Sequence, residues 1–110
     1  MSVLVVLEQT RGVYHRMSWE ALALGLPVSA VVIGEPGEAA TKGIERLYVL
    51  PAMEYSADGY TAVLAQLIAR VQPSHVLFPH TYQVRDFAPK LATRLGRVLV
   101  SDVVKLQADG

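Results

Sequence analysis

Short apolar runs of strand length alternate along the chain with segments whose apolar residues recur at helical spacing. Uninterrupted runs of aliphatic and β-branched residues are typical of strands that are covered on both faces of a sheet. The sequence therefore predicts a buried sheet of five strands. These strands are expected over Val3–Leu7, Val28–Ile33, Leu47–Leu50, Val76–Phe78 and Val98–Val104, the last of which is interrupted by Ser101 and Asp102.

The clearest helix is predicted over Tyr60–Val71, between the third and fourth strands. Its apolar residues lie three or four positions apart, so that they share one face of a helix. Asp58 or Gly59 stands near its start and Pro73 follows its end. These residue types are common at the two ends of a helix. The apolar face is expected to pack on the sheet.

A second well-marked helix is predicted after the fourth strand. Asp86 is the expected N-cap, Pro89 falls in the first turn, and Gly96 ends the helix. Two shorter helices are predicted upstream. One contains Met17–Leu24 and is closed by Gly25, and the other covers Pro36–Lys42.

Strands that alternate with helices pair in parallel through right-handed crossovers. The predicted fold class is therefore α/β, a three-layer α/β/α sandwich with a mainly parallel, doubly wound five-stranded sheet in the order 3-2-1-4-5. In such sheets ligands bind at the carboxyl ends of the strands, where the winding reverses. The loops after the first and fourth strands are therefore the places to search for a site.

The composition limits the classes of partner. The 110 residues form one domain, 1–110, and 52% of them are hydrophobic, which is more than one small core requires. Ten basic and ten acidic residues give no net charge, so neither nucleic acid nor an anionic membrane is expected as a partner. A neutral, apolar surface is poorly protected against association. We expect an interface with another chain, and self-association when the domain is alone.

The N-terminal segment lacks the features of a signal peptide, and no apolar run approaches the ~20 residues of a membrane span. A cytoplasmic location is therefore expected. The chain contains no cysteine, and His15, His75 and His80 do not together form a metal-ligand motif. Of these three, His80 has the best position, at the carboxyl end of the fourth strand.

The common catalytic and cofactor motifs of α/β proteins are missing from the sequence. The stretch Glu8–Gly12 after the first strand holds one glycine, whereas dinucleotide binding needs several. There is no glycine-rich loop that ends in Lys-Ser or Lys-Thr and no Gly-x-Ser-x-Gly elbow. Tyr14 and Trp19 are expected to pack against the sheet. The chain alone is predicted not to be an enzyme.

One stretch of the sequence is specific. Thr81 is followed by Arg85-Asp86, then by the apolar-Ala-Pro-basic-apolar-Ala series Phe87–Ala92, and later by Ser101-Asp102 before Val103. This series resembles the N-terminal domain of the electron transfer flavoprotein alpha subunit. The resemblance extends over nearly the whole chain, with Val84 standing where the family has a glycine before the arginine.

The resemblance implies an adenine nucleotide alpha hydrolase-like fold and a role in assembly. In the family this domain contacts the beta subunit and the remainder of the alpha subunit. FAD is held in a later part that carries a Ser-Gly-x-x-Gln-His motif, which this chain does not contain. The chain is therefore expected to hold no cofactor itself. The complete complex is an electron carrier from flavin dehydrogenases toward the respiratory chain, with FAD as its cofactor.

The candidate ligand or partner-contact loop consists of Thr81, Arg85 and Asp86. A helix N-terminus attracts anions, but an N-cap at Asp86 would satisfy its free N–H groups. Three roles stay open for Arg85: it could bind a phosphate, pair with a carboxylate of the partner chain, or be a solvated charge. The alternative function is a small adenine-nucleotide-binding domain of the universal stress or nucleotide hydrolase type. The absence of glycine from Pro79–Val84 weighs against it.

Overall fold

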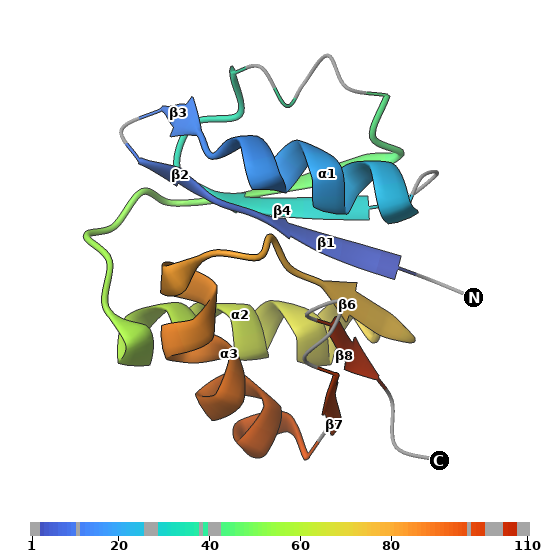
Figure 1. Cartoon of the computed structure of the whole chain (residues 1–110). Coiled ribbons are helices and arrows are strands. Elements are labelled where there is room, and N and C mark those ends of the chain that lie inside the picture. The colour runs from blue at the N-terminus through green and yellow to red at the C-terminus, as the bar shows by residue number, and fades with distance from the viewer. Residues whose placement is uncertain are drawn as a thin grey trace.

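The computed structural model describes residues 3–10, 12–25, 29–37, 39, 43–96, 98–100 and 105–107 (Figure 1). Three helices and eight strands lie within these ranges. The helices are α1 (Arg16–Gly25), α2 (Ala57–Val71) and α3 (Tyr82–Leu95). The strands are β1 (Val3–Leu7), β2 (Gln9–Thr10), β3 (Val13–Tyr14), β4 (Ser29–Ile33), β5 (Arg46–Leu50), β6 (His75–Leu77), β7 (Val98–Val100) and β8 (Lys105–Gln107).

The main sheet has the strand order β5-β4-β1-β6-β8-β7, and its first four strands are parallel. Helix α1 lies over one face of this sheet, and α2 and α3 lie over the other (Figure 1). The predicted three-layer α/β sandwich is confirmed, and so is the order 3-2-1-4 of its first four strands. The winding reverses between β1 and β6, so this is the switch point of the sheet.

The two faces of β1 explain why its sequence is continuously apolar. Leu4 and Val6 belong to the core beneath α2 and α3, whereas Val5 and Leu7 belong to the core beneath α1. All four side chains are buried. Strand β4 alternates in the same way. A strand between two helical layers has no solvent face, which is why β1 consists of apolar residues alone.

The predicted fifth strand, Val98–Val104, is confirmed at its start, where β7 lies, but its predicted place next to β6 is wrong. The first strand of this region, β7, ends at Val100, and the second, β8, begins at Lys105. Strand β8 pairs antiparallel with both β6 and β7 and therefore occupies the place next to β6 that the prediction gave to the fifth strand. Residues 101–104 lie outside the described residues. Antiparallel strands need no crossover helix between them, so β8 can lie between β7 and β6.

Two other segments differ from the prediction. The loop after β1 contains a small antiparallel hairpin, β2 and β3, in which Gln9 pairs with Tyr14. The predicted helix Pro36–Lys42 lies largely outside the described residues and stays a prediction. Within its described part, the Ala39 N–H donates a 2.9 Å hydrogen bond to the Pro36 carbonyl oxygen, which closes a single turn.

Helix α3 begins earlier than predicted. Its N-cap is Thr81, with extended backbone at φ −131° and ψ 163°, so the predicted N-cap at Asp86 is wrong. Pro89 accordingly lies inside the helix and not in its first turn. The proline lacks the N–H that would donate to the Arg85 carbonyl oxygen. The helix tolerates Pro89 in its interior, whereas the prediction assumed that a proline must lie in the first turn, and this assumption moved the predicted start to Asp86.

No helix within the described part of the chain is both long enough and apolar enough to cross a membrane.

Candidate functional site at the carboxyl edge

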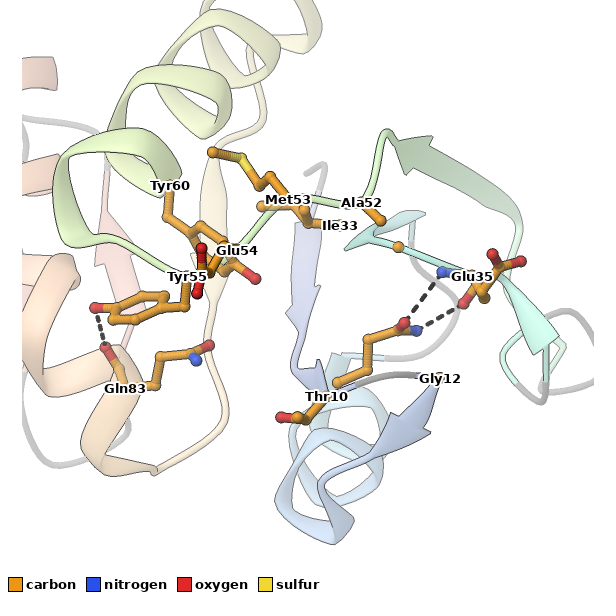
Figure 2. Close-up of a pocket in the computed structure, with 12 residues that line it drawn as sticks. Thr10, Gly12, Ile33, Glu35, Ala52, Met53, Glu54, Tyr55, Tyr60 and Gln83 are labelled. Atoms are coloured by element: carbon orange, nitrogen blue, oxygen red, sulfur yellow. Dashed lines mark hydrogen bonds between the residues drawn. The ribbon is translucent and has the colours of Figure 1, made fainter.

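Two hollows lie at the carboxyl edge of the parallel strands. The larger, of about 530 Å³, is lined by the segments that follow β1, β4 and β5, together with Tyr60 of α2 and Gln83 of α3 (Figure 2). The smaller, of about 300 Å³, is lined by His15, Thr81, Arg85 and two neighbours of Thr81 in sequence. The larger hollow is called the edge pocket below, and the smaller the α3 hollow. Both lie where ligands bind in open α/β sheets.

The structure gives Thr81 a structural role. Its Oγ1 accepts a hydrogen bond of 3.2 Å from the Val84 N–H and donates one of 2.6 Å to Oε1 of Glu8. The Glu8 N–H in turn donates to Oγ of Ser18, a fully buried residue of α1, over 2.8 Å. Because Glu8 directly follows β1, it connects the first turns of α1 and α3 across the switch point.

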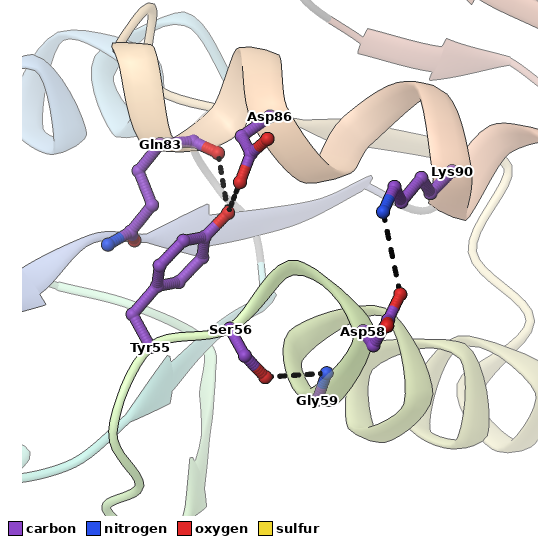
Figure 3. Close-up of polar contacts among 7 residues, drawn as sticks. All are labelled: Tyr55, Ser56, Asp58, Gly59, Gln83, Asp86 and Lys90. Carbon is purple, nitrogen blue, oxygen red and sulfur yellow. Dashed lines mark hydrogen bonds and ion pairs between the residues drawn. The ribbon is translucent and has the colours of Figure 1, made fainter.

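Asp86 is also used inside the fold. Its carboxylate accepts a hydrogen bond of 2.6 Å from the Tyr55 hydroxyl, which lies 3.4 Å from the Gln83 carbonyl oxygen (Figure 3). Burial, followed by this hydrogen bond to Asp86, raises the pKa of the Tyr55 hydroxyl well above its usual range. The contact attaches α3 to the segment before α2, whose N-cap is Ser56. Asp86 does not line either hollow.

Arg85 is the one member of the predicted loop whose charge faces the α3 hollow. Its Nη2 lies 2.9 Å from Nε2 of His80, and its guanidinium lies 6.0 Å from the ring centre of Tyr82. A guanidinium can only donate, so the His80 nitrogen accepts. Tyr82 is 88% exposed. Of the three residues of the predicted loop, Thr81 and Asp86 therefore make contacts within the fold. Arg85 is an exposed cation beside the exposed ring of Tyr82.

The other two histidines have local partners. Nδ1 of His15 accepts a 3.1 Å hydrogen bond from the Met17 N–H at the start of α1. His75 lies in β6, with its Nδ1 3.1 Å from Oγ of Ser74. The described residues contain no group of three or more His, Cys, Asp or Glu side chains that could hold a metal ion. As expected from the sequence, Tyr14 and Trp19 pack against the α1 face of the sheet.

Sequence reasoning missed the edge pocket. One of its walls is fixed by Gln9, whose Nε2 donates to the Glu35 carbonyl oxygen over 2.6 Å and whose Oε1 accepts from the Glu35 N–H over 3.0 Å. The Tyr14 hydroxyl lies 2.8 Å from the same carbonyl oxygen. Gly34 has φ +134°, and a Cβ atom there would lie 2.3 Å from Oε1 of Gln9. Glycine is therefore required at position 34 if Gln9 is to hold this loop.

The opposite wall is aromatic. Tyr55 and Tyr60 meet edge to face with ring centres 4.8 Å apart, and Tyr60 also packs on Phe87. The charged side chains among the described lining residues are Glu35 and Glu54, with no lysine or arginine. Phosphate sites in this type of fold use positive charge and glycine-rich backbone. The described part of the edge pocket has neither positive charge nor a glycine-rich backbone segment with which to bind a nucleotide phosphate.

Comparison with known proteins gives the family. Residues 3–110 match the family model described as the electron transfer flavoprotein domain. The chain belongs to this family. The chain is similar to Protein FixB of Azotobacter vinelandii, with 34% identity over 97% of this chain and 35% of that protein.

Two alpha subunits are also among the relatives of this chain. The electron transfer flavoprotein subunit alpha of Syntrophomonas wolfei is 32% identical over 94% of this chain and 36% of that protein. The corresponding subunit of Bacillus subtilis is 31% identical over 98% of this chain and 38% of that protein. The chain thus spans little more than a third of the length of these relatives. The resemblance drawn from Thr81–Val103 is confirmed, and the adenine-nucleotide alternative is not favoured.

Proposed function

We propose that this chain is the assembly domain of an electron transfer flavoprotein alpha subunit. In this role it binds a beta subunit and the remainder of the alpha subunit, and it holds no FAD itself. The complex carries electrons between flavin dehydrogenases and the respiratory chain in the cytoplasm. The domain contributes no catalytic group to this transfer, because its part is to position the chains that surround the flavin.

The observation that carries this proposal is the internal use of the predicted ligand loop. Thr81 and Asp86 are occupied by Glu8 and Tyr55, so neither is free for a small molecule. The same edge of the sheet presents two exposed apolar side chains, Tyr82 at 88% and Val13 at 73% exposure. A loop that stabilises the fold and an edge with exposed apolar groups favour contact with another chain over nucleotide binding.

Co-purification tests the proposal. The tagged chain is co-expressed with the beta subunit and the remaining alpha segment of the same organism, and the products are separated by gel filtration. We expect the chain to elute with both partners and with flavin absorbance. The double substitution Val13→Ser, Tyr82→Ser should weaken this association at least tenfold, because interface aromatics carry much of the binding free energy. Thr93→Ala, at an exposed position of α3, is the matched control.

Two results would contradict the proposal. One is a chain that stays apart from both partners although they associate with each other. The other is flavin bound stoichiometrically to the chain alone, since the proposal assigns FAD to the remainder of the complex.

A further inference from the structure

The hydroxyl group of Tyr60 points into the edge pocket (Figure 2). The Tyr60 residue is 92% buried, since 8% of its surface is exposed, and its ring packs on Tyr55 and Phe87. Within the described residues its hydroxyl makes no hydrogen bond, and it reaches toward the space between Tyr55 and Ile33 (Figure 2). The hydroxyl oxygen is not among the buried polar atoms that lack a partner in the described residues, so it faces the open space of the pocket. The pocket therefore has, at its inner end, a polar group that a ligand can reach.

Three glutamates line the edge pocket or a recess next to it. Glu54 and Glu35 line the edge pocket on opposite sides. Glu8 lines a narrow recess that shares Tyr60, Ile33 and Gln83 with the pocket. Burial, and then the negative charge of Glu8, raise the pKa of the Tyr60 hydroxyl above its usual value, so the group stays neutral near pH 7. The nearby Asp86 carboxylate is already bonded to Tyr55.

The polar groups that remain free in the pocket are mostly acceptors. The carboxylates of Glu35 and Glu54 have only acceptor oxygens, and neither side chain is in an ion pair within the described residues. The Tyr60 hydroxyl and the Gln83 amide can accept as well. A ligand that satisfies this set must supply N–H donors and positive charge. The carboxylates do not form a metal-ion cluster among the described residues, which favours a cation whose donors are spread over several atoms.

We propose that the edge pocket binds an organic cation through its ammonium or guanidinium group, with the Tyr60 hydroxyl and the Glu54 carboxylate as acceptors. The volume of about 530 Å³ is suited to a molecule with an aliphatic body as well as a charged head. Ile33, Ala52 and Met53 supply the apolar lining for that body. This assignment does not depend on the proposed role in assembly.

Agmatine is the probe, because it carries a guanidinium, an aliphatic chain and an ammonium group. The ¹⁵N-labelled chain is titrated with agmatine at pH 7 and low salt, and amide shifts are followed by NMR. We expect saturable shifts at Thr10, Glu35 and Glu54 with a dissociation constant of about 1 mM or below. N-butylurea, which has the donors but no charge, should bind at least about tenfold more weakly.

Two substitutions locate the site, and one serves as a control. Tyr60→Phe keeps the ring in the core and removes only the hydroxyl, and Glu54→Gln removes an exposed charge, so both variants should fold. Each should weaken agmatine binding by about fivefold or more. Glu20→Gln, on the exposed face of α1 and outside the pocket, should leave the affinity within about twofold. Thermal melting of each variant verifies that it is folded.

Several outcomes would overturn the proposal. One is the absence of saturable shifts up to about 20 mM agmatine. Another is an affinity that either pocket variant leaves unchanged, or that the charge-neutral urea matches. A third is AMP binding with shifts at the same residues, because an anionic ligand in this pocket contradicts its negative field.

Discussion

The Thr81 hydroxyl and the Glu8 carboxylate form a 2.6 Å hydrogen bond that joins residues 73 positions apart in the sequence. Thr81 precedes α3 on one side of the switch point, and Glu8 follows β1 on the other. Thr81 is 8% exposed, so the bond is largely protected from water. The contact therefore closes the gap between the two halves of the sheet, at the position where related folds leave a crevice for a ligand.

Thr81→Val should destabilise the domain by about 1–3 kcal/mol. The substitution removes both the N-cap acceptor of the Val84 N–H and the donor to Glu8, at nearly constant side-chain volume. Thr81→Ser retains the hydroxyl and should cost less than half as much. Urea unfolding of both variants measures the difference. Equal losses for valine and serine would show that packing, and not the hydroxyl, is responsible.

Tyr55→Phe should change the alkaline limb of the stability profile. The pKa of the Tyr55 hydroxyl is raised in the folded domain, so above pH 10 the unfolded chain releases a proton that the folded chain retains. The free energy of unfolding then falls with rising pH, by up to about 1.4 kcal/mol per pH unit from this group. Below pH 10 the hydroxyl is protonated in both states, and its hydrogen bond to Asp86 contributes fully.

Urea unfolding at several pH values between 8.5 and 11.5 tests this effect. In Tyr55→Phe the decline above pH 10 should be shallower than in the parent chain. Asp86→Asn removes the charge that disfavours the tyrosinate and should give an intermediate slope. A decline of the same steepness in all three chains would contradict the assignment to Tyr55.

The layered fold could be predicted because its signals are local. Each of the four parallel strands is a short apolar run, and α2 shows regular helical spacing. The start of α3 is harder to predict, because Thr81 and Asp86 are both residue types that commonly cap helices. The choice was decided by a contact with Glu8, far away in sequence, and by the tolerance of Pro89 inside α3. Neither signal can be read from the neighbouring residues alone.

The edge pocket could not be predicted because its parts come from four separate segments. Gln9, Glu35, Glu54 and Tyr60 each look unremarkable where they stand in the sequence, and only the sheet order brings them together. The predicted loop from Thr81 to Asp86 was correctly placed at the carboxyl edge. Thr81 and Asp86 make hydrogen bonds within the fold because α3 begins earlier than predicted, which places Asp86 inside the helix and next to Tyr55.

Gly34→Ala should destabilise the domain by about 1–3 kcal/mol. The left-handed backbone at φ +134° disfavours alanine, and the added Cβ would collide with the Gln9 amide that holds Glu35. Gly43→Ala is the matched control, since Gly43 has φ +73° but open space around a Cβ atom. In the double variant with Gln9→Ala, part of the Gly34→Ala loss should disappear. Additive losses in urea unfolding would mean that the collision with Gln9 contributes nothing.

Arg85→Ala should leave both stability and nucleotide response unchanged. The guanidinium contacts His80 and Tyr82, and both it and its partners lie at the surface, where such contacts contribute little to stability. We expect the substitution to change the free energy of unfolding by no more than about 0.5 kcal/mol.

If the α3 hollow bound a nucleotide phosphate, Arg85 would be its main described cation, and millimolar AMP or ATP would raise the melting temperature of the parent chain but not of Arg85→Ala. Thr81 and Asp86 already form hydrogen bonds within the fold, and Pro79–Val84 contains no glycine, so we expect no such rise. A nucleotide-dependent rise that vanishes in Arg85→Ala would place the α3 hollow among phosphate sites and return the domain to the nucleotide-binding class.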